Sequence, residues 1–161
     1  PQGWIWQGGI ALAVIMFGDS VDGTLARMTT GGTRFGAFLD STLDRLGDGA
    51  VFGSLTAYAV FQMDDSIVRT WAIIAGICSI VGAAAVPYAR ARAESVGVVA
   101  KLGIAERTDS LIVGMGAAML MSLGLPEWVF ALGLTWVALA SFVTVCQRIW
   151  FTARHIDEGP R

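Results

Sequence analysis

The stretch WVFALGLTWVALASFVTVCQ, residues 128–147, decides the fold class because it has the length of a membrane-spanning helix and no charged side chain. A helix needs about 20 predominantly apolar residues to cross the hydrocarbon core of a bilayer. Four other uncharged stretches predict further spans: residues 1–18, 51–63, 71–88 and 110–126. The helix that contains the second of these is expected to begin near Ala37. The sequence therefore predicts an all-α integral membrane protein with five visible transmembrane helices.

The composition of the whole chain agrees with a membrane location. Hydrophobic residues make up 55% of the chain and charged residues only 15%, whereas soluble domains carry about 25% charged residues. This composition excludes intrinsic disorder, and a net charge of −2 excludes a nucleic-acid-binding module. Two cysteines and one histidine exclude a disulfide scaffold and a zinc cage. We expect a single membrane domain over residues 1–161.

The distribution of basic residues predicts the orientation. With five spans, the connectors at 27–45 and 90–107 and the C-terminal end fall on the same side of the bilayer. These segments carry all the Lys and Arg residues except Arg69. Because basic connectors stay in the cytoplasm, we expect a multi-pass protein of the cell membrane whose basic side faces the cytoplasm.

Four aspartates lie where the first two predicted spans meet. Asp19 and Asp22 are spaced i, i+3, and Asp40 and Asp44 are spaced i, i+4, so each pair shares one helix face. A glycine-rich turn at residues 28–36 would bring the two pairs together. Carboxylates near hydrocarbon are costly, and four of them repel one another unless cations lie between them. Oxygen ligands without His or Cys suit magnesium or manganese, and a two-metal site suits phosphoryl chemistry.

Residues near these aspartates suit a phosphate-containing ligand. Gly23 and Ala26 are small enough for a ligand to approach the helix closely, and the planar fork of Arg27 matches a pyrophosphate. An alternative interpretation is that the acids only form helix-end salt bridges with Arg27, Arg34 and Arg45.

The pattern Asp19-x2-Asp22-Gly23-x2-Ala26-Arg27-x8-Gly36-x3-Asp40-x3-Asp44 resembles the signature of the CDP-alcohol phosphotransferase family. All eight fixed positions match. The resemblance implies a homodimer whose subunits have an N-terminal amphipathic helix and a six-helix bundle. Since only five spans are visible, we expect the amphipathic helix and the first span to be absent from residues 1–161.

The resemblance also implies an activity, which is metal-dependent transfer of a phosphatidyl group from CDP-diacylglycerol to an alcohol, with release of CMP. By this analogy, Asp44 is the general base that takes the proton from the acceptor hydroxyl. Two magnesium or manganese ions would be held by Asp19, Asp22, Asp40 and Asp44. The CDP site would be lined by Gly23, Ala26 and Arg27.

Three arginines at separate span ends are candidates for binding a phosphorylated acceptor: Arg90, Arg107 and Arg148. Guanidinium groups that converge can hold one phosphate through charge-assisted hydrogen bonds. The alternative is that these residues only reflect the ordinary charge bias of cytoplasmic connectors.

The segments around these arginines are similar to the actinobacterial phosphatidylinositol phosphate synthase branch, whose acceptor is inositol phosphate. Tyr88, Arg92 and Glu94 match that pattern, whereas Pro87 replaces a Ser and Ser110 stands where an Arg is expected. Phosphatidylglycerol phosphate synthesis, or transfer to another phosphorylated polyol, is therefore the alternative within the family.

Two other classes of membrane protein fit parts of the pattern. A divalent cation transporter would use the acidic cluster to carry ions, and a scaffold protein would use it to pair helices. The formation of CMP distinguishes the enzyme from the transporter. The scaffold predicts that Asp44→Asn unfolds or dissociates the protein, whereas the enzyme predicts a folded but inactive variant.

Overall fold

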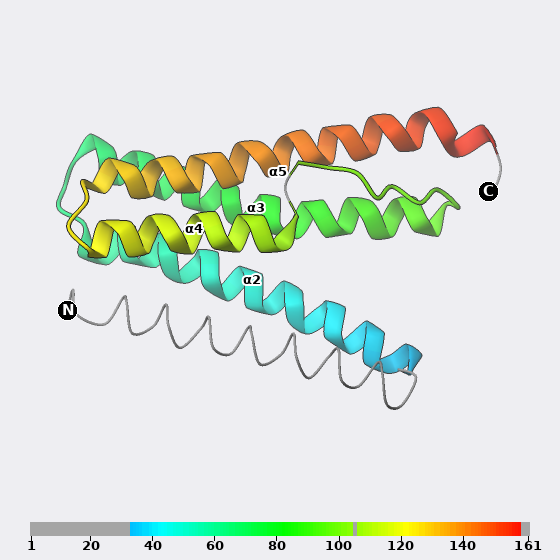
Figure 1. The fold of residues 1–161 in the computed structure, drawn as a ribbon, viewed down its shortest axis with the longest axis horizontal. Coiled ribbons are helices and arrows are strands. Elements are labelled where there is room, and N and C mark those ends of the chain that lie inside the picture. The colour runs from blue at the N-terminus through cyan, green and yellow to red at the C-terminus, as the bar shows by residue number, and fades with distance from the viewer. Residues whose placement is uncertain (1–32, 105, 159–161) are drawn as a thin grey trace.

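The computed structural model describes residues 33–104 and 106–158, and this part of the chain is helical. The candidate residues Asp19, Asp22, Gly23, Ala26 and Arg27 lie outside the described residues. Four long helices and a short 3-10 helix follow one another: α2 (Arg34–Gln62), α3 (Ile67–Ser95), α4 (Arg107–Ser122), α5 (Glu127–His155) and η2 (Ile156–Glu158). The four long helices form an elongated bundle (Figure 1).

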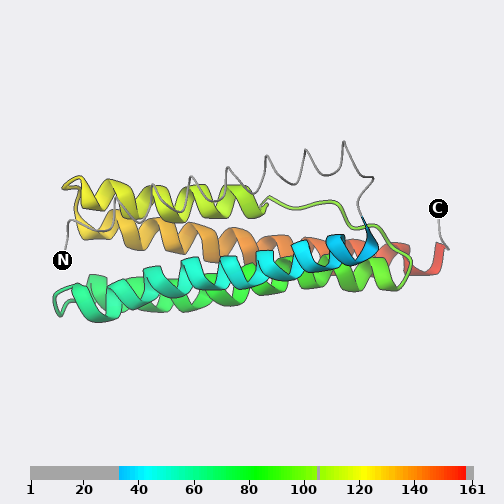
Figure 2. The ribbon, with the colours of Figure 1, turned by 90° about the horizontal axis from the view of Figure 1, so that it is seen from below.

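The connectors place two turns at one end of the bundle. Residues 63–66, between α2 and α3, and residues 123–126, between α4 and α5, lie at this end (Figures 1 and 2). The start of α2 and the ends of α3 and α5 lie at the opposite end. Residues 96–106 run from there back toward the start of α4. The basic segments of the described chain therefore gather at one end.

Local capping explains where the helices start. The side chain of Thr33 accepts a hydrogen bond from the backbone N–H of Gly36 at 3.0 Å, and that of Ser66 accepts one from Arg69 at 3.1 Å. The prediction of a turn through residue 36 was wrong at its C-terminal end, because this cap starts α2 at Arg34. Short turns at residues 63–66 and 123–126 join the helices in pairs, and Gly124 supplies a positive φ of 101° to the second.

Two helices extend beyond the uncharged stretches that predicted them. α3 continues to Ser95, so the connector expected at 90–107 begins only at residue 96. An i, i+4 ion pair between Arg90 and Glu94, at 3.0 Å, supports this last part of the helix. α5 likewise continues past Arg148 to His155. The predicted spans stopped at the first charged residue. A helix can continue past such a residue once it has left the apolar layer of the membrane.

Among the described helices, α3 and α5 are long and apolar enough to cross a membrane. α4 has 16 residues, fewer than the ~20 that a span requires, and α2 carries Asp40, Asp44, Arg45 and Asp48 in its first half. The predicted number of five spans is therefore not confirmed.

The centre of the bundle is held by close contacts between small residues. α3 packs most extensively against α5, where a Cβ atom added to Gly82 would lie 2.6 Å from the Cβ of Ser141. The Ser79 hydroxyl on α3 donates a hydrogen bond to the Leu134 carbonyl of α5 at 2.9 Å. Small residues and hydroxyl groups of this kind let membrane helices approach closely. This packing determines how α3 and α5 are rotated relative to each other.

Large apolar side chains cover the outside of the bundle. Phe61, Ile67 and Phe142, for example, are 78%, 87% and 68% exposed. A soluble monomer rarely exposes so much contiguous apolar surface, whereas a lipid-facing surface requires it. The exposed face thus agrees with the apolar character of α3 and α5.

Candidate active site

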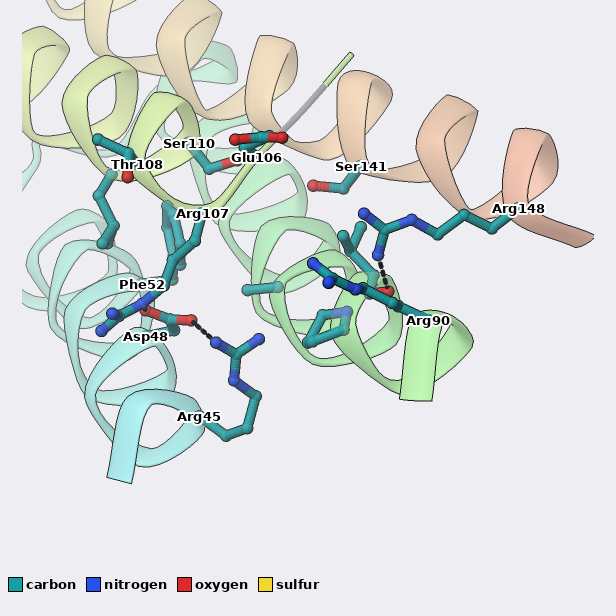
Figure 3. Close-up of a pocket in the computed structure, with 14 residues that line it drawn as sticks. Arg45, Asp48, Phe52, Arg90, Glu106, Arg107, Thr108, Ser110, Ser141 and Arg148 are labelled. Atoms are coloured by element: carbon teal, nitrogen blue, oxygen red, sulfur yellow. Dashed lines mark hydrogen bonds and ion pairs between the residues drawn. The ribbon is translucent and has the colours of Figure 1, made fainter. Parts of the chain in front are cut away.

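All four long helices contribute to one cavity of about 250 Å³ with several charged side chains in its lining (Figure 3). The cavity lies toward the basic end of the bundle, and its charged lining comes from residues far apart in the sequence: Arg45, Asp48, Arg90, Glu106, Arg107 and Arg148. The three arginines predicted from span ends thus line a single cavity, one each from α3, α4 and α5. Four guanidiniums face two carboxylates in this lining, so the cavity favours an anion.

Arg148 is the most buried cation of the lining, at 7% exposure. Its Nε donates to the carbonyl of Leu102 at 2.9 Å, and its Nη1 donates to the carbonyl of Val86. Backbone carbonyls satisfy these donors but do not neutralise the positive charge. A buried charge is costly unless it is paired, and an anion in the cavity would supply that pairing.

Arg90, on α3, also lines the cavity and has a weaker hold than Arg148 (Figure 3). Its Nε donates to Glu94 at 3.0 Å, and both side chains are 44% exposed. Exposed ion pairs contribute only about 0–1 kcal/mol, so Arg90 can exchange Glu94 for a ligand phosphate at little cost.

Arg107 connects the cavity to one of the predicted metal ligands. Its Nη1 lies 2.8 Å from Asp44 Oδ1, and its Nε lies 2.8 Å from Asp48 Oδ1. Arg45 approaches the same two acids, with its Nη2 3.4 Å from Asp48 Oδ2 and 3.9 Å from Asp44 Oδ2. Two carboxylates and two guanidiniums therefore form one network at the cavity wall.

The sequence did not assign Asp48 and Arg45, two members of this network, to the site. From the sequence, Asp48 could be either a supporting partner of Asp44, one turn away, or a neighbour of Arg45, and Arg45 is predicted only as a salt-bridge partner. The spacing of Asp44, Asp48 and the buried Phe52 at i, i+4 and i+8 places all three on one helix face. That periodicity was the signal that the face of α2 carrying Asp48 points into the protein.

The predicted metal ligands are only partly described. Asp40 is exposed on α2, and the Asp44 side chain is 21% exposed one turn later. Within residues 33–104 and 106–158, no three metal-ligating side chains form a group, and Asp19 and Asp22 lie outside these residues. The two described carboxylates offer hard oxygen ligands at helical spacing, a donor set that fits magnesium or manganese. The salt bridge of Asp44 to Arg45, which the alternative interpretation required, is also present.

Pro87 and Ser110, which depart from the inositol phosphate pattern, both line the cavity. Pro87 lies on α3 near Arg90, and Ser110 is buried in the first part of α4. A side chain at either position thus borders the space where an acceptor would bind.

Comparison with known proteins extends these observations. The model of the CDP-alcohol phosphatidyltransferase family matches residues 1–146. The phosphatidylinositol phosphate synthase of Mycolicibacterium smegmatis is 39% identical over 152 residues, which cover 92% of this chain and 66% of the relative. The synthase of the same name from Cutibacterium acnes is 37% identical over 156 residues, 92% of this chain and 73% of the relative. The chain thus spans about two thirds to three quarters of the length of these relatives.

Solved structures give the same result for the fold. The crystal structure of the Mycobacterium tuberculosis phosphatidylinositol phosphate synthase with manganese and citrate has a TM-score of 0.83 and 34% identity, and the match covers 95% of this chain and 72% of the other. The crystal structure of that enzyme with CDP-DAG bound has a TM-score of 0.82 and 34% identity, covering 94% and 75%. The family match spans most of the chain and includes every predicted aspartate ligand. The chain belongs to the CDP-alcohol phosphatidyltransferase family.

Proposed function

We propose that this protein transfers the phosphatidyl group of CDP-diacylglycerol to a hydroxyl of inositol phosphate, giving phosphatidylinositol phosphate and CMP. The observation that carries the proposal is the cavity lined by Arg90, Arg107 and Arg148, in which Arg107 also contacts Asp44. A phosphate-binding pocket therefore adjoins a carboxylate of the family motif. The names of the relatives and the CDP-DAG-bound neighbour support the donor and the acceptor.

The residues of this chain suit an in-line displacement. The acceptor hydroxyl oxygen attacks the phosphorus of the phosphatidyl group, the bond from that phosphorus to the CMP oxygen breaks, and the hydroxyl proton passes to Asp44. A hydroxyl is a weak nucleophile, so a nearby carboxylate base is needed. The arginines orient the acceptor through its phosphate, and a cavity of about 250 Å³ suits one small polar molecule.

Two divalent ions complete the proposed site. Asp19, Asp22, Asp40 and Asp44 would hold magnesium or manganese, and Gly23, Ala26 and Arg27 would line the CDP site. Such ions, when bound, neutralise the pyrophosphate and stabilise the departing CMP. The neighbour in complex with manganese supports a divalent ion of this type.

We further propose a multi-pass protein of the cell membrane, built as a single domain on the six-helix plan of its family and active as a homodimer. Its site would face the cytoplasm. The apolar helices α3 and α5 and the collection of basic residues at one end of the bundle support this topology. A site at that surface would let a lipid donor meet a soluble acceptor.

The proposal is tested by measuring CMP release from CDP-diacylglycerol with magnesium by the purified protein in detergent. Inositol phosphate, glycerol 3-phosphate, free inositol and serine are compared as acceptors. We expect turnover with inositol phosphate, and turnover lower by at least about a hundredfold after Asp44→Asn. Turnover only with glycerol 3-phosphate would reassign the acceptor, and metal-independent or absent CMP release would refute the proposed reaction.

A further inference from the structure

Asp48 is a buried carboxylate that neither the family motif nor the proposed reaction uses. It lies one helical turn after Asp44 on α2, and its side chain is only 5% exposed. A buried carboxylate is costly unless charged or hydrogen-bonding partners compensate it. Asp48 obtains this compensation from Arg107, at 2.8 Å, and from Arg45, at 3.4 Å.

Both partners of Asp48 line the cavity proposed to bind the acceptor phosphate. Figure 3 shows Asp48 between Arg45 and Arg107 at the cavity wall. The two oxygens of Asp48 are shared between them, with Oδ1 bound to the Nε of Arg107 and Oδ2 facing the Nη2 of Arg45. One carboxylate thus holds two guanidiniums that come from different helices.

The contact to Nε has a specific consequence for Arg107. A bond at Nε restrains the plane of the guanidinium, while a bond at a terminal nitrogen alone lets the group turn. Nη1 of the same guanidinium contacts Asp44, on the side of the proposed base. Asp48 therefore draws Arg107 inward and balances the attraction of Asp44.

We infer that Asp48 is a positioning residue that presents the guanidiniums of Arg107 and Arg45 to the acceptor phosphate without touching the acceptor itself. This inference rests on the proposed function, because it assigns Asp48 a role in binding the phosphorylated acceptor. A preorganised guanidinium loses less side-chain freedom when the phosphate binds, so Asp48 acts on acceptor affinity rather than on the chemical step.

The test begins with Asp48→Asn, which keeps the shape of the side chain and removes its charge. We expect the KM for inositol phosphate to rise by about tenfold to a hundredfold, the loss typical of a hydrogen bond to a charged group, with kcat changed by less than about threefold. The matched control is Asp65→Asn, which breaks a 3.2 Å ion pair with Arg69 at the opposite end of the bundle and should leave KM unchanged. An unchanged KM in Asp48→Asn, or a loss confined to kcat, would overturn the inference.

A double-mutant cycle separates positioning from general stability. If Asp48 acts through Arg107, Asp48→Asn should raise KM far less in an Arg107→Lys background than in the wild type. Equal effects in both backgrounds would show that Asp48 acts by another route. If Asp48→Asn does not fold, Asp48→Glu takes its place, because its longer side chain keeps the charge but displaces the carboxylate from Arg107. The KM for inositol phosphate should then rise in the wild type and rise far less in the Arg107→Lys background, and equal effects would overturn the inference.

Measuring the equilibrium binding of inositol phosphate tests the role of Asp48 separately from the proposed reaction. A wild-type protein that binds inositol phosphate without releasing CMP refutes the proposed reaction, and its affinity relative to Asp48→Asn still decides the role of Asp48. Equal affinities in the two proteins would overturn that role even if the reaction is confirmed.

Discussion

Replacing Arg148 by lysine separates charge from geometry at the most buried cation of the cavity. The guanidinium joins three parts of the structure, because it lies on α5, its Nε binds the Leu102 carbonyl of the 96–106 connector, and its Nη1 binds the Val86 carbonyl of α3. The lysine ammonium keeps the positive charge but is a compact point charge without a planar fork. It reaches one of these carbonyls and leaves the other without its donor.

The expected cost follows from the hydrogen bond that is lost. A hydrogen bond to a charged group contributes about 1.5–3 kcal/mol. In a domain of this size each kcal/mol shifts the melting temperature by about 2–4 °C, so the apparent Tm should fall by about 3–12 °C. The KM for inositol phosphate should rise as well, because the connector carrying Leu102 would no longer be tied to α5.

Thermal unfolding in detergent at a fixed scan rate measures the first effect, and CMP release against acceptor concentration measures the second. Arg92→Lys is the matched control, because this exposed arginine has a single side-chain contact to Ser95 Oγ at 3.3 Å. Its Tm should change by no more than about 2 °C, as for most surface substitutions. An equal shift in both variants, or no shift in Arg148→Lys, would refute the idea that the two carbonyl contacts hold the cavity wall.

Three further outcomes are expected. Asp44→Asn should fold and elute from a size-exclusion column like the wild type. Its kcat should be lower by about 10²–10⁴-fold, as expected for removal of a general base. A variant that fails to fold would count against that role. Gly82→Ala should destabilise the bundle by about 1–3 kcal/mol, because the added Cβ would lie 2.6 Å from the Cβ of Ser141. Gly116→Ala is the control, because a Cβ added there would meet no neighbouring helix within 4 Å. Equal thermal stability of the two variants would contradict the packing argument. Chelation of divalent ions by EDTA should abolish CMP release, and added magnesium or manganese should restore it; CMP release that survives chelation would exclude the aspartate-bound ions.

Local sequence information was sufficient for the helices. The uncharged stretches at 71–88 and 128–147 located α3 and α5. Helix ends were less predictable, because charged residues such as Arg90 and Arg148 interrupt an apolar stretch without interrupting the backbone hydrogen bonds. Apolar periodicity reports which residues are shielded from water or exposed to lipid, not where a helix stops.

The motif spacing by itself determined the family. It also predicted a set of aspartate ligands for metal ions, since i, i+3 and i, i+4 spacing places side chains on one helix face in any tertiary context. Only the tertiary structure decided that Arg90, Arg107 and Arg148 line one cavity and that Asp48 joins Arg107 to Arg45. These contacts join different helices, or depend on which face of α2 is buried. They are set by the rotation and close approach of packed helices, at contacts such as Gly82 with Ser141. No spacing along a single helix encodes that rotation, because it depends on the surfaces of two helices at once.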